Sequence, residues 1–142
     1  MHSGCMVMWQ PGDEVELAAG WRLWLELSTR GWPGQDWDGT PAAAVRPLRD
    51  LITACEEVHA GYLAESRTPS ATIVQFLQSI VMVASLPISL WCDDVHEVDV
   101  DRAALLHSDL AGFIEHVTAI RALLAVGGGW AEFDADQSRR AS

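Results

Sequence analysis

The chain has 142 residues, of which 49% are apolar and 20% charged, a composition typical of one globular domain rather than of a disordered segment. Its formal net charge of −11 argues against binding to a nucleic-acid backbone, which requires clustered cations. Three cysteines, an odd number, and a start without an apolar leader region lead us to expect a cytoplasmic protein with free thiols.

The first predicted helix follows the stretch PGDE, where Asp13 or Gly12 can cap the helix and acids occupy its first turn. It extends to about Arg30, with Gly31 as the stop. Its apolar residues form a broad face that we expect to be packed inward: Val15, Leu17, Trp21, Trp24, Leu25 and Leu27.

The second predicted helix begins where Thr40 caps and Pro41 occupies the first helical position, and it ends near Glu65. Five of its residues alternate at spacings of four and three, which places them on one face of a helix. They are Leu48, Ile52, Cys55, His59 and Tyr62.

The third predicted helix follows a second cap-plus-proline pair at 68–69, and no charged residue occurs over 68–92. The length of this run allows a membrane span, but Gln75, Gln78 and Pro87 interrupt it. A buried central helix, apolar nearly all round because other helices surround it, explains the run without a membrane. We expect Pro87 to end this helix.

The fourth predicted helix is capped by Asp99 or Asp101 and stopped by Gly127. Its apolar residues step by four and three without interruption, as at the a and d positions of a packed helix. This seam consists of Leu106, Leu110, Phe113, Val117, Ile120 and Leu124.

These segments predict an all-α protein, an antiparallel four-helix bundle with a buried central third helix. A single domain over 1–130 is expected, followed by a flexible tail at 131–142. A small α+β fold is the alternative, with strands at PISLWC and HEVDV.

Two similar pentapeptides, CEEVH at 55–59 and CDDVH at 92–96, suggest a zinc site. Thiolate and imidazole are ligands that zinc prefers, and a Cys₂His₂ set would close a tetrahedron. The candidate ligands are Cys55, His59, Cys92 and His96. The alternative is that Cys55 is a small core residue and His59 a satisfied polar residue of the helix face, with no cofactor bound.

An acidic stretch precedes the fourth helix. It lacks the central glycine of an EF-hand loop, so calcium binding of that type is excluded. Helix capping and a solvated surface explain these acids, and a docking patch for a basic protein partner is the functional alternative. The residues concerned are Asp93, Asp94, Glu97, Asp99 and Asp101.

The hexapeptide RAALLH, from Arg102 to His107, resembles the Arg-x₄₋₆-His motif of the HEPN ribonucleases, which are also helical bundles. The resemblance implies an RNA-cleaving site in which Arg102 and His107 face a phosphate. Ala103 stands where that family usually has a polar residue.

Two of the seven tryptophans, Trp32 and Trp37, stand in WPG and WDG between the first two predicted helices. This turn resembles that of the WxG family of small helical hairpins, whose simple fold leaves no place for a third and fourth helix. Such tryptophans either cover the end of a bundle or anchor an interface, because tryptophan is enriched at binding hot spots.

We therefore expect a non-catalytic acidic helical bundle that mediates protein–protein interaction, as an adaptor, an immunity or antitoxin-like protein or a self-associating chain. A homo-oligomer formed through the first helix and the tryptophan loop is one form of this hypothesis. No nucleic-acid or membrane partner is expected. A zinc-binding bundle and a HEPN-like ribonuclease are the alternatives.

Overall fold

A computed structural model describes residues 9–29, 41–69, 71–90 and 100–141 of the chain. Within these ranges the protein contains helices and no strand, which confirms the all-α prediction. The helices are α1 (Glu14–Thr29), α2 (Pro41–Glu65), α3 (Ala71–Leu90), α4 (Val100–Gly128) and α5 (Ala131–Ala141).

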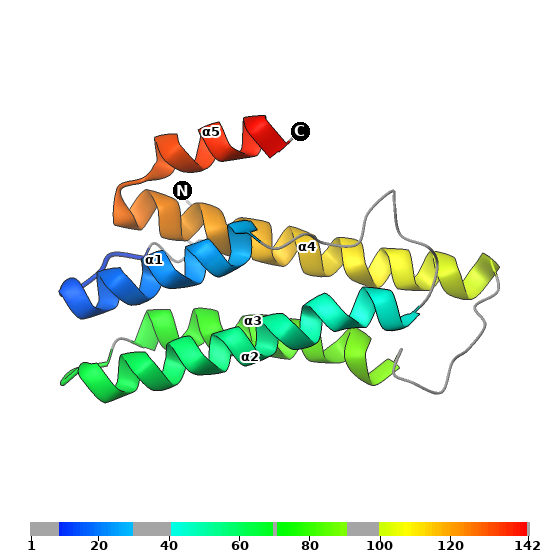
Figure 1. Cartoon of the computed structure of the whole chain (residues 1–142), viewed down its shortest axis with the longest axis horizontal. Helices are drawn as coiled ribbons and strands as arrows, with labels where there is room; N and C mark the ends of the chain where they lie inside the picture. Colours follow the sequence, from blue (N-terminus) through cyan, green and yellow to red (C-terminus); the bar gives the residue numbers. More distant parts are fainter. Residues whose placement is uncertain (1–8, 30–40, 70, 91–99, 142) are drawn as a thin grey trace, which may run out of the picture.

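The first four helices lie side by side, and consecutive helices run in opposite directions along the long axis (Figure 1). Helix α1 packs against α2 and α4, and α3 packs against the same two helices from the other side. Helix α5 folds back over the end of α4 (Figure 1). The core therefore lies between four helices, with α5 added outside it.

The seam predicted for α4 is the centre of this core. All six of its residues, from Leu106 to Leu124, are buried. The face predicted for α2 is rotated slightly from the observed one. Leu51 and Val58 take interior positions, whereas Ile52 and His59 are only half-buried at its edge.

The N-terminus of α1 is capped by Asp13, as the sequence predicts: its Oδ1 accepts the backbone N–H of Glu16 at 2.8 Å. Glu16 is itself buried, and its carboxylate accepts hydrogen bonds from the Trp9 indole N–H at 2.7 Å and from the Gly12 backbone N–H at 2.9 Å. A buried carboxylate needs such donors, because burying it without partners is costly. This network holds Trp9 against the bundle.

Trp9 is 1% exposed and lies against glycines of two helices. A methyl group at Gly20 of α1 would overlap its ring, and one at Gly127 of α4 would overlap its ring and its carbonyl. Both glycines therefore allow a close approach that a larger residue would block.

Helix α3 differs from its prediction in two respects. It continues through Pro87 and ends at Leu90, so Pro87 is not its stop. The fixed φ of proline is compatible with a helix, and a place in the last turn removes only one hydrogen bond. Pro87 is also buried, which compensates for that loss.

The second difference is that α3 is not enclosed on all sides. Ile73, Leu77 and Ile80 face the core, but Met82 and Leu86 on the opposite side are 63% and 62% exposed. The uncharged run is therefore one buried face plus an exposed apolar face. The prediction of a buried central third helix is wrong in this respect.

The segment predicted as a tail contains α5. Helix α4 ends at Gly128, one residue beyond the predicted stop, and Gly129 follows with φ +91°. The Trp130 N–H then bonds to the Ala125 carbonyl at 2.9 Å, the closing bond of a Schellman turn. This turn directs α5 back over α1 and α4.

The Trp9 contact predicts opposite effects for two glycine-to-alanine substitutions. Gly20→Ala should lower the free energy of unfolding by about 1–3 kcal/mol, because the new methyl overlaps the Trp9 ring. Gly61→Ala in α2, where nothing lies within 4 Å of the new methyl, should raise it by about 0.5–1 kcal/mol. Urea unfolding followed by circular dichroism measures both. A stabilising Gly20→Ala would contradict the packing described for Trp9.

Candidate functional site

Four of the tryptophans form a cluster at one end of the bundle. Trp21 stacks on Trp24 with ring centroids 5.1 Å apart, and Trp130 meets Trp21 edge to face at 5.0 Å. Trp9 contacts Trp130 at 6.4 Å, and Phe133 of α5 covers Trp24 at 5.4 Å. Of the tryptophans of α1, Trp24 is buried, whereas Trp21 is 37% exposed, so the face predicted to pack inward is only partly covered.

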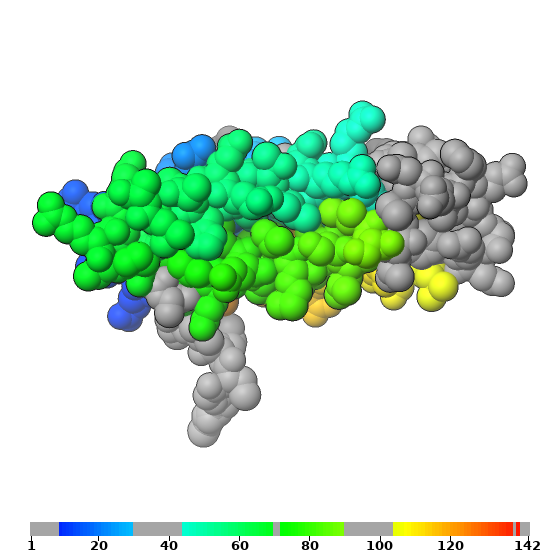
Figure 2. All heavy atoms as spheres, turned by 90° about the horizontal axis from the view of Figure 1, so that it is seen from below, coloured from blue at the N-terminus to red at the C-terminus, as the bar shows by residue number. Residues whose placement is uncertain are grey.

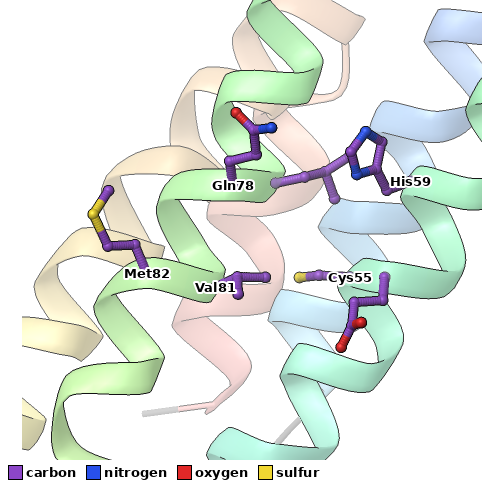
Figure 3. A pocket seen from close by; sticks show the side chains of 7 residues that line it. Cys55, His59, Gln78, Val81 and Met82 are labelled. Carbon is purple, nitrogen blue, oxygen red and sulfur yellow. The ribbon is translucent and has the colours of Figure 1, made fainter.

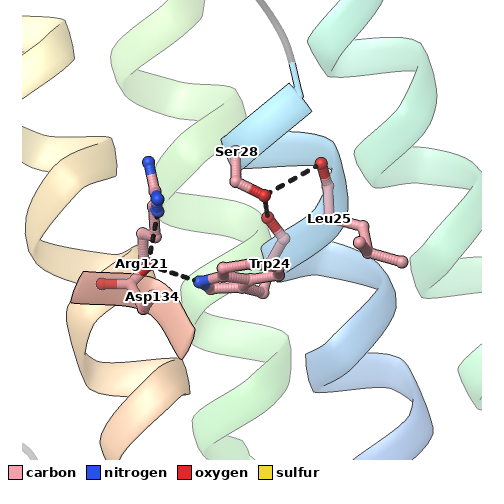
Figure 4. A network of polar contacts seen from close by, with 5 residues as sticks. All are labelled: Trp24, Leu25, Ser28, Arg121 and Asp134. Carbon is pink, nitrogen blue, oxygen red and sulfur yellow. Dashed lines mark hydrogen bonds and ion pairs between the residues drawn. The ribbon is translucent and has the colours of Figure 1, made fainter. Parts of the chain in front are cut away.

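One carboxylate joins α5 to this cluster. Asp134 Oδ1 accepts the Trp24 indole N–H at 2.7 Å and the Arg121 Nε–H at 2.5 Å (Figure 4). The Arg121 guanidinium also lies 5.5 Å from the centre of a Trp24 ring, within cation–π range. Side chains from α1, α4 and α5 therefore meet at Asp134.

The two zinc candidates in the described ranges lie together. Cys55 and His59 of α2 border a pocket of ≈ 380 Å³ between α2 and α3, and the Cys55 thiol points toward Val81 (Figure 3). Cys55 is 1% exposed, as expected for the alternative in which it is a small residue of the core. The other lining residues are Glu56, Leu77, Gln78, Val81 and Met82.

The complete zinc set cannot be assembled from the described residues, because Cys92 and His96 lie outside them. Within the described ranges no three His, Cys, Asp or Glu side chains come close enough to hold one metal ion. The zinc site thus stays a prediction.

A serine and a histidine meet between α3 and α4. The Ser79 hydroxyl donates to the Phe76 carbonyl at 3.0 Å, so it is free to accept the Nε2–H of His116 at 3.1 Å. This arrangement corresponds to the tautomer of His116 that carries its proton on Nε2. The contact joins α3 to α4.

The ribonuclease candidates both belong to α4. His107 is exposed on this helix, whereas the side chain of Arg102 lies outside the described residues. The side chain of Asp101, in the first turn of α4, also lies outside them. The remaining predicted interaction residues, Trp32, Trp37, Asp93, Asp94, Glu97 and Asp99, are not among the described residues either.

The most distinctive surface of the described chain belongs to α3 and α4. We call it the α3–α4 face and define it by outward residues of both helices. Its apolar projections are Met82 and Leu86, which are 63% and 62% exposed, and Leu105, which is 60% exposed. Its other members are small or uncharged polar residues: Gln75, Gln78, Ser89, Ser108, Gly112 and Ala119.

A groove runs between the two helices of this face. It has a volume of ≈ 320 Å³, about that of ten water molecules in the liquid. Apolar side chains and one glycine form most of its wall, and Asp109 contributes a half-buried carboxylate. The lining residues are Val83, Leu86, Pro87, Ser108, Asp109, Gly112 and Phe113.

Charge is distributed unequally between the two sides of the bundle. Helix α3 has no charged residue, and the exposed titratable side chains described for α4 over 104–128 are His107 and Glu115. Helix α2, in contrast, exposes charged side chains along its length: Arg46, Arg49, Asp50, Glu56, Glu57 and Glu65. Figure 2 looks onto the face where α2 and α3 lie side by side.

The sequence alone does not distinguish the α3–α4 face from a core. Its signal is the uncharged run over 68–92, which is equally compatible with burial on every side. The positions at which α3 faces solvent include Met82 and Leu86, and only their exposure distinguishes an interaction surface from a core.

The chain matches no protein-family model, no curated protein and no solved structure.

Removing the Asp134 carboxylate should loosen α5. Asp134→Ala deprives Trp24 and Arg121 of their shared acceptor, and hydrogen bonds to charged groups contribute about 1.5–3 kcal/mol each when partly buried. We expect faster amide hydrogen exchange in α5 and a change in tryptophan fluorescence. Glu132→Ala is the matched control, because Glu132 is an exposed carboxylate of the same helix and its removal should change the free energy of unfolding by under about 0.5 kcal/mol. Equal effects of the two variants would contradict this role of Asp134.

The zinc hypothesis makes a separate prediction. Protein purified without a histidine tag should contain about one equivalent of zinc per chain by elemental analysis, because four thiolate and imidazole ligands bind zinc tightly. Cys55→Ser and Cys92→Ser should each remove it, and Cys5→Ser should not. Less than roughly a tenth of an equivalent in the wild type would end the hypothesis.

Proposed function

We propose that this protein is a non-catalytic interaction module that binds a protein partner through the α3–α4 face. The observation that supports it most directly is the exposure of Met82, Leu86 and Leu105, each 60–63% accessible on two adjacent helices. Large apolar side chains gathered on one surface are typical of binding sites in proteins that fold as isolated domains. Single exposed apolar residues would carry no such meaning.

The energy available at this face is appreciable. Burying a leucine or methionine side chain completely contributes about 1.5–3 kcal/mol, so covering the unburied parts of three such residues contributes on the order of 4 kcal/mol. Association also costs translational and rotational freedom, so further contacts are needed for a stable complex. The groove between α3 and α4 offers them, because it can receive apolar side chains from a partner.

A protein partner fits this face better than a lipid bilayer. By length and composition alone, the windows Thr72–Ser89 of α3 and Ala104–Gly128 of α4 could each cross a membrane, and 33% of each window is buried. Asp109, Glu115 and Arg121 lie inside the second window, however, and charged groups are costly in hydrocarbon. A chain of net charge −11 is also repelled by anionic lipid head groups.

The other hypotheses stay predictions beside this one. A zinc site would use Cys55 and His59 together with Cys92 and His96, and a ribonuclease would use Arg102 and His107. A basic partner would instead use the acids at 93–101. The zinc alternative adjoins the α3–α4 face, because Gln78 and Met82 line the same pocket as Cys55 and His59.

Photo-crosslinking tests the proposed function. A photoreactive phenylalanine analogue at position 82 should give a covalent adduct with a protein, because Met82 projects from the α3–α4 face. The same analogue at position 57 is the control, because Glu57 is exposed on α2, away from that face. Adducts are detected by gel mobility and mass spectrometry. Equal yields at both positions, or no protein adduct at position 82, would contradict the proposal.

A further inference from the structure

We infer that the partner of the α3–α4 face is a second copy of this chain, related to the first by a two-fold axis perpendicular to the face. This inference depends on the proposed function and names its partner. Two features of the described residues support it: the distribution of charge and the shape of the face.

Charge restricts how two copies can meet. Each chain has a net charge of −11, so two copies repel one another in most orientations. The described side chains of α3 and of α4 over 104–128 include two acids, Asp109 and Glu115, and one arginine, Arg121. Like charges opposed across an interface cost several kcal/mol, so within the described residues the sparsely charged α3–α4 face brings few like charges together.

A basic partner would bind a surface with many acidic side chains. One such surface is that of α2 around Glu56 and Glu57, because long-range attraction guides oppositely charged proteins together. The low charge of the α3–α4 face gives a basic protein little to recognise.

The shape of the face is self-complementary. Met82 projects from α3 and turns away from Cys55 (Figure 3). Val83 and Leu86, one and four residues further along the same helix, line the ≈ 320 Å³ groove between α3 and α4. A two-fold axis passing between Met82 and the groove places the Met82 of each copy over the groove of the other. Methionine suits such a site because its unbranched side chain adapts to irregular gaps.

The polar members of the face are compatible with this arrangement. Gln75 and Gln78 are exposed on α3, and an amide both donates and accepts hydrogen bonds. Either amide can therefore pair with a donor or an acceptor of the second copy without bringing a charge into the interface. Gly112 and Ala119 of α4 are small and allow a helix of the second copy to approach closely.

Sedimentation equilibrium of the full-length chain tests the inference. The wild type should have twice the 15.5 kDa mass of one chain at micromolar concentrations. Leu86→Glu should weaken the dimer by roughly a hundredfold or more, because each copy then brings an uncompensated carboxylate into an apolar contact. Leu63→Glu is the matched control: it makes the same change on α2, at a leucine that is 46% exposed, and the dimer should persist. Circular dichroism confirms that both variants remain helical.

Three results would overturn the inference. They are a wild type that remains monomeric into the millimolar range, a dimer unaffected by Leu86→Glu, and equal weakening by Leu86→Glu and Leu63→Glu. The crosslinking experiment separates this failure from that of the proposed function. If position 82 gives an adduct with a different protein and the chain is a monomer, only the inference that the partner is a second copy is overturned. If position 82 gives no protein adduct and the chain is a monomer, both the inference and the proposed function are overturned. Binding to phosphatidylcholine vesicles without dimerisation would also overturn both, and would show that the face binds a lipid surface.

Discussion

The burial of one apolar seam, from Leu106 to Leu124 of α4, is the constraint on which the rest of the bundle depends. Its residues recur at spacings of four and three, so they all face the core for the length of a long helix. Helices α1 and α3 each pack against α4, and α2 closes the bundle by contacting both of them. Because the seam determines which side of α4 is internal, it also determines which side remains at the surface.

Aromatic residues near both ends of α1 pack against the bundle. At its start, Asp13 and Glu16 satisfy backbone and indole N–H groups and hold Trp9 in place. Toward its end, Trp24 meets Asp134 of α5. Aromatic packing and the hydrogen bond from Trp24 thus attach a fifth helix to the other four, while Trp21 beside it stays 37% exposed. This leaves α3 and α4 as the helices with the least covered apolar surface.

The sequence predicted where helices begin and end better than which side of each helix is buried. The bounds of α1 and α2 were recognisable because caps and prolines act locally, within a turn of the residue concerned. The continuation of α3 through Pro87 was not recognisable from the sequence, because a proline in a last turn is tolerated only if its surroundings compensate for the lost hydrogen bond. Helix α5 lies in the segment predicted as a tail, because its polar sequence forms a helix only against the cluster of Trp21, Trp24 and Trp130, which is assembled from distant parts of the chain.

By itself, the sequence determined the helical class, the four main segments and the seam of α4, because hydrophobic period and capping chemistry are properties of neighbouring residues. The tertiary structure alone decided which side of α3 faces water. An uncharged run has the same composition whether it is enclosed or half-exposed, and the difference arises only when α2 and α4 cover one side and leave Met82 and Leu86 uncovered. The same holds for the close contacts of Trp9 with Gly20 and Gly127, residues that only the fold brings together.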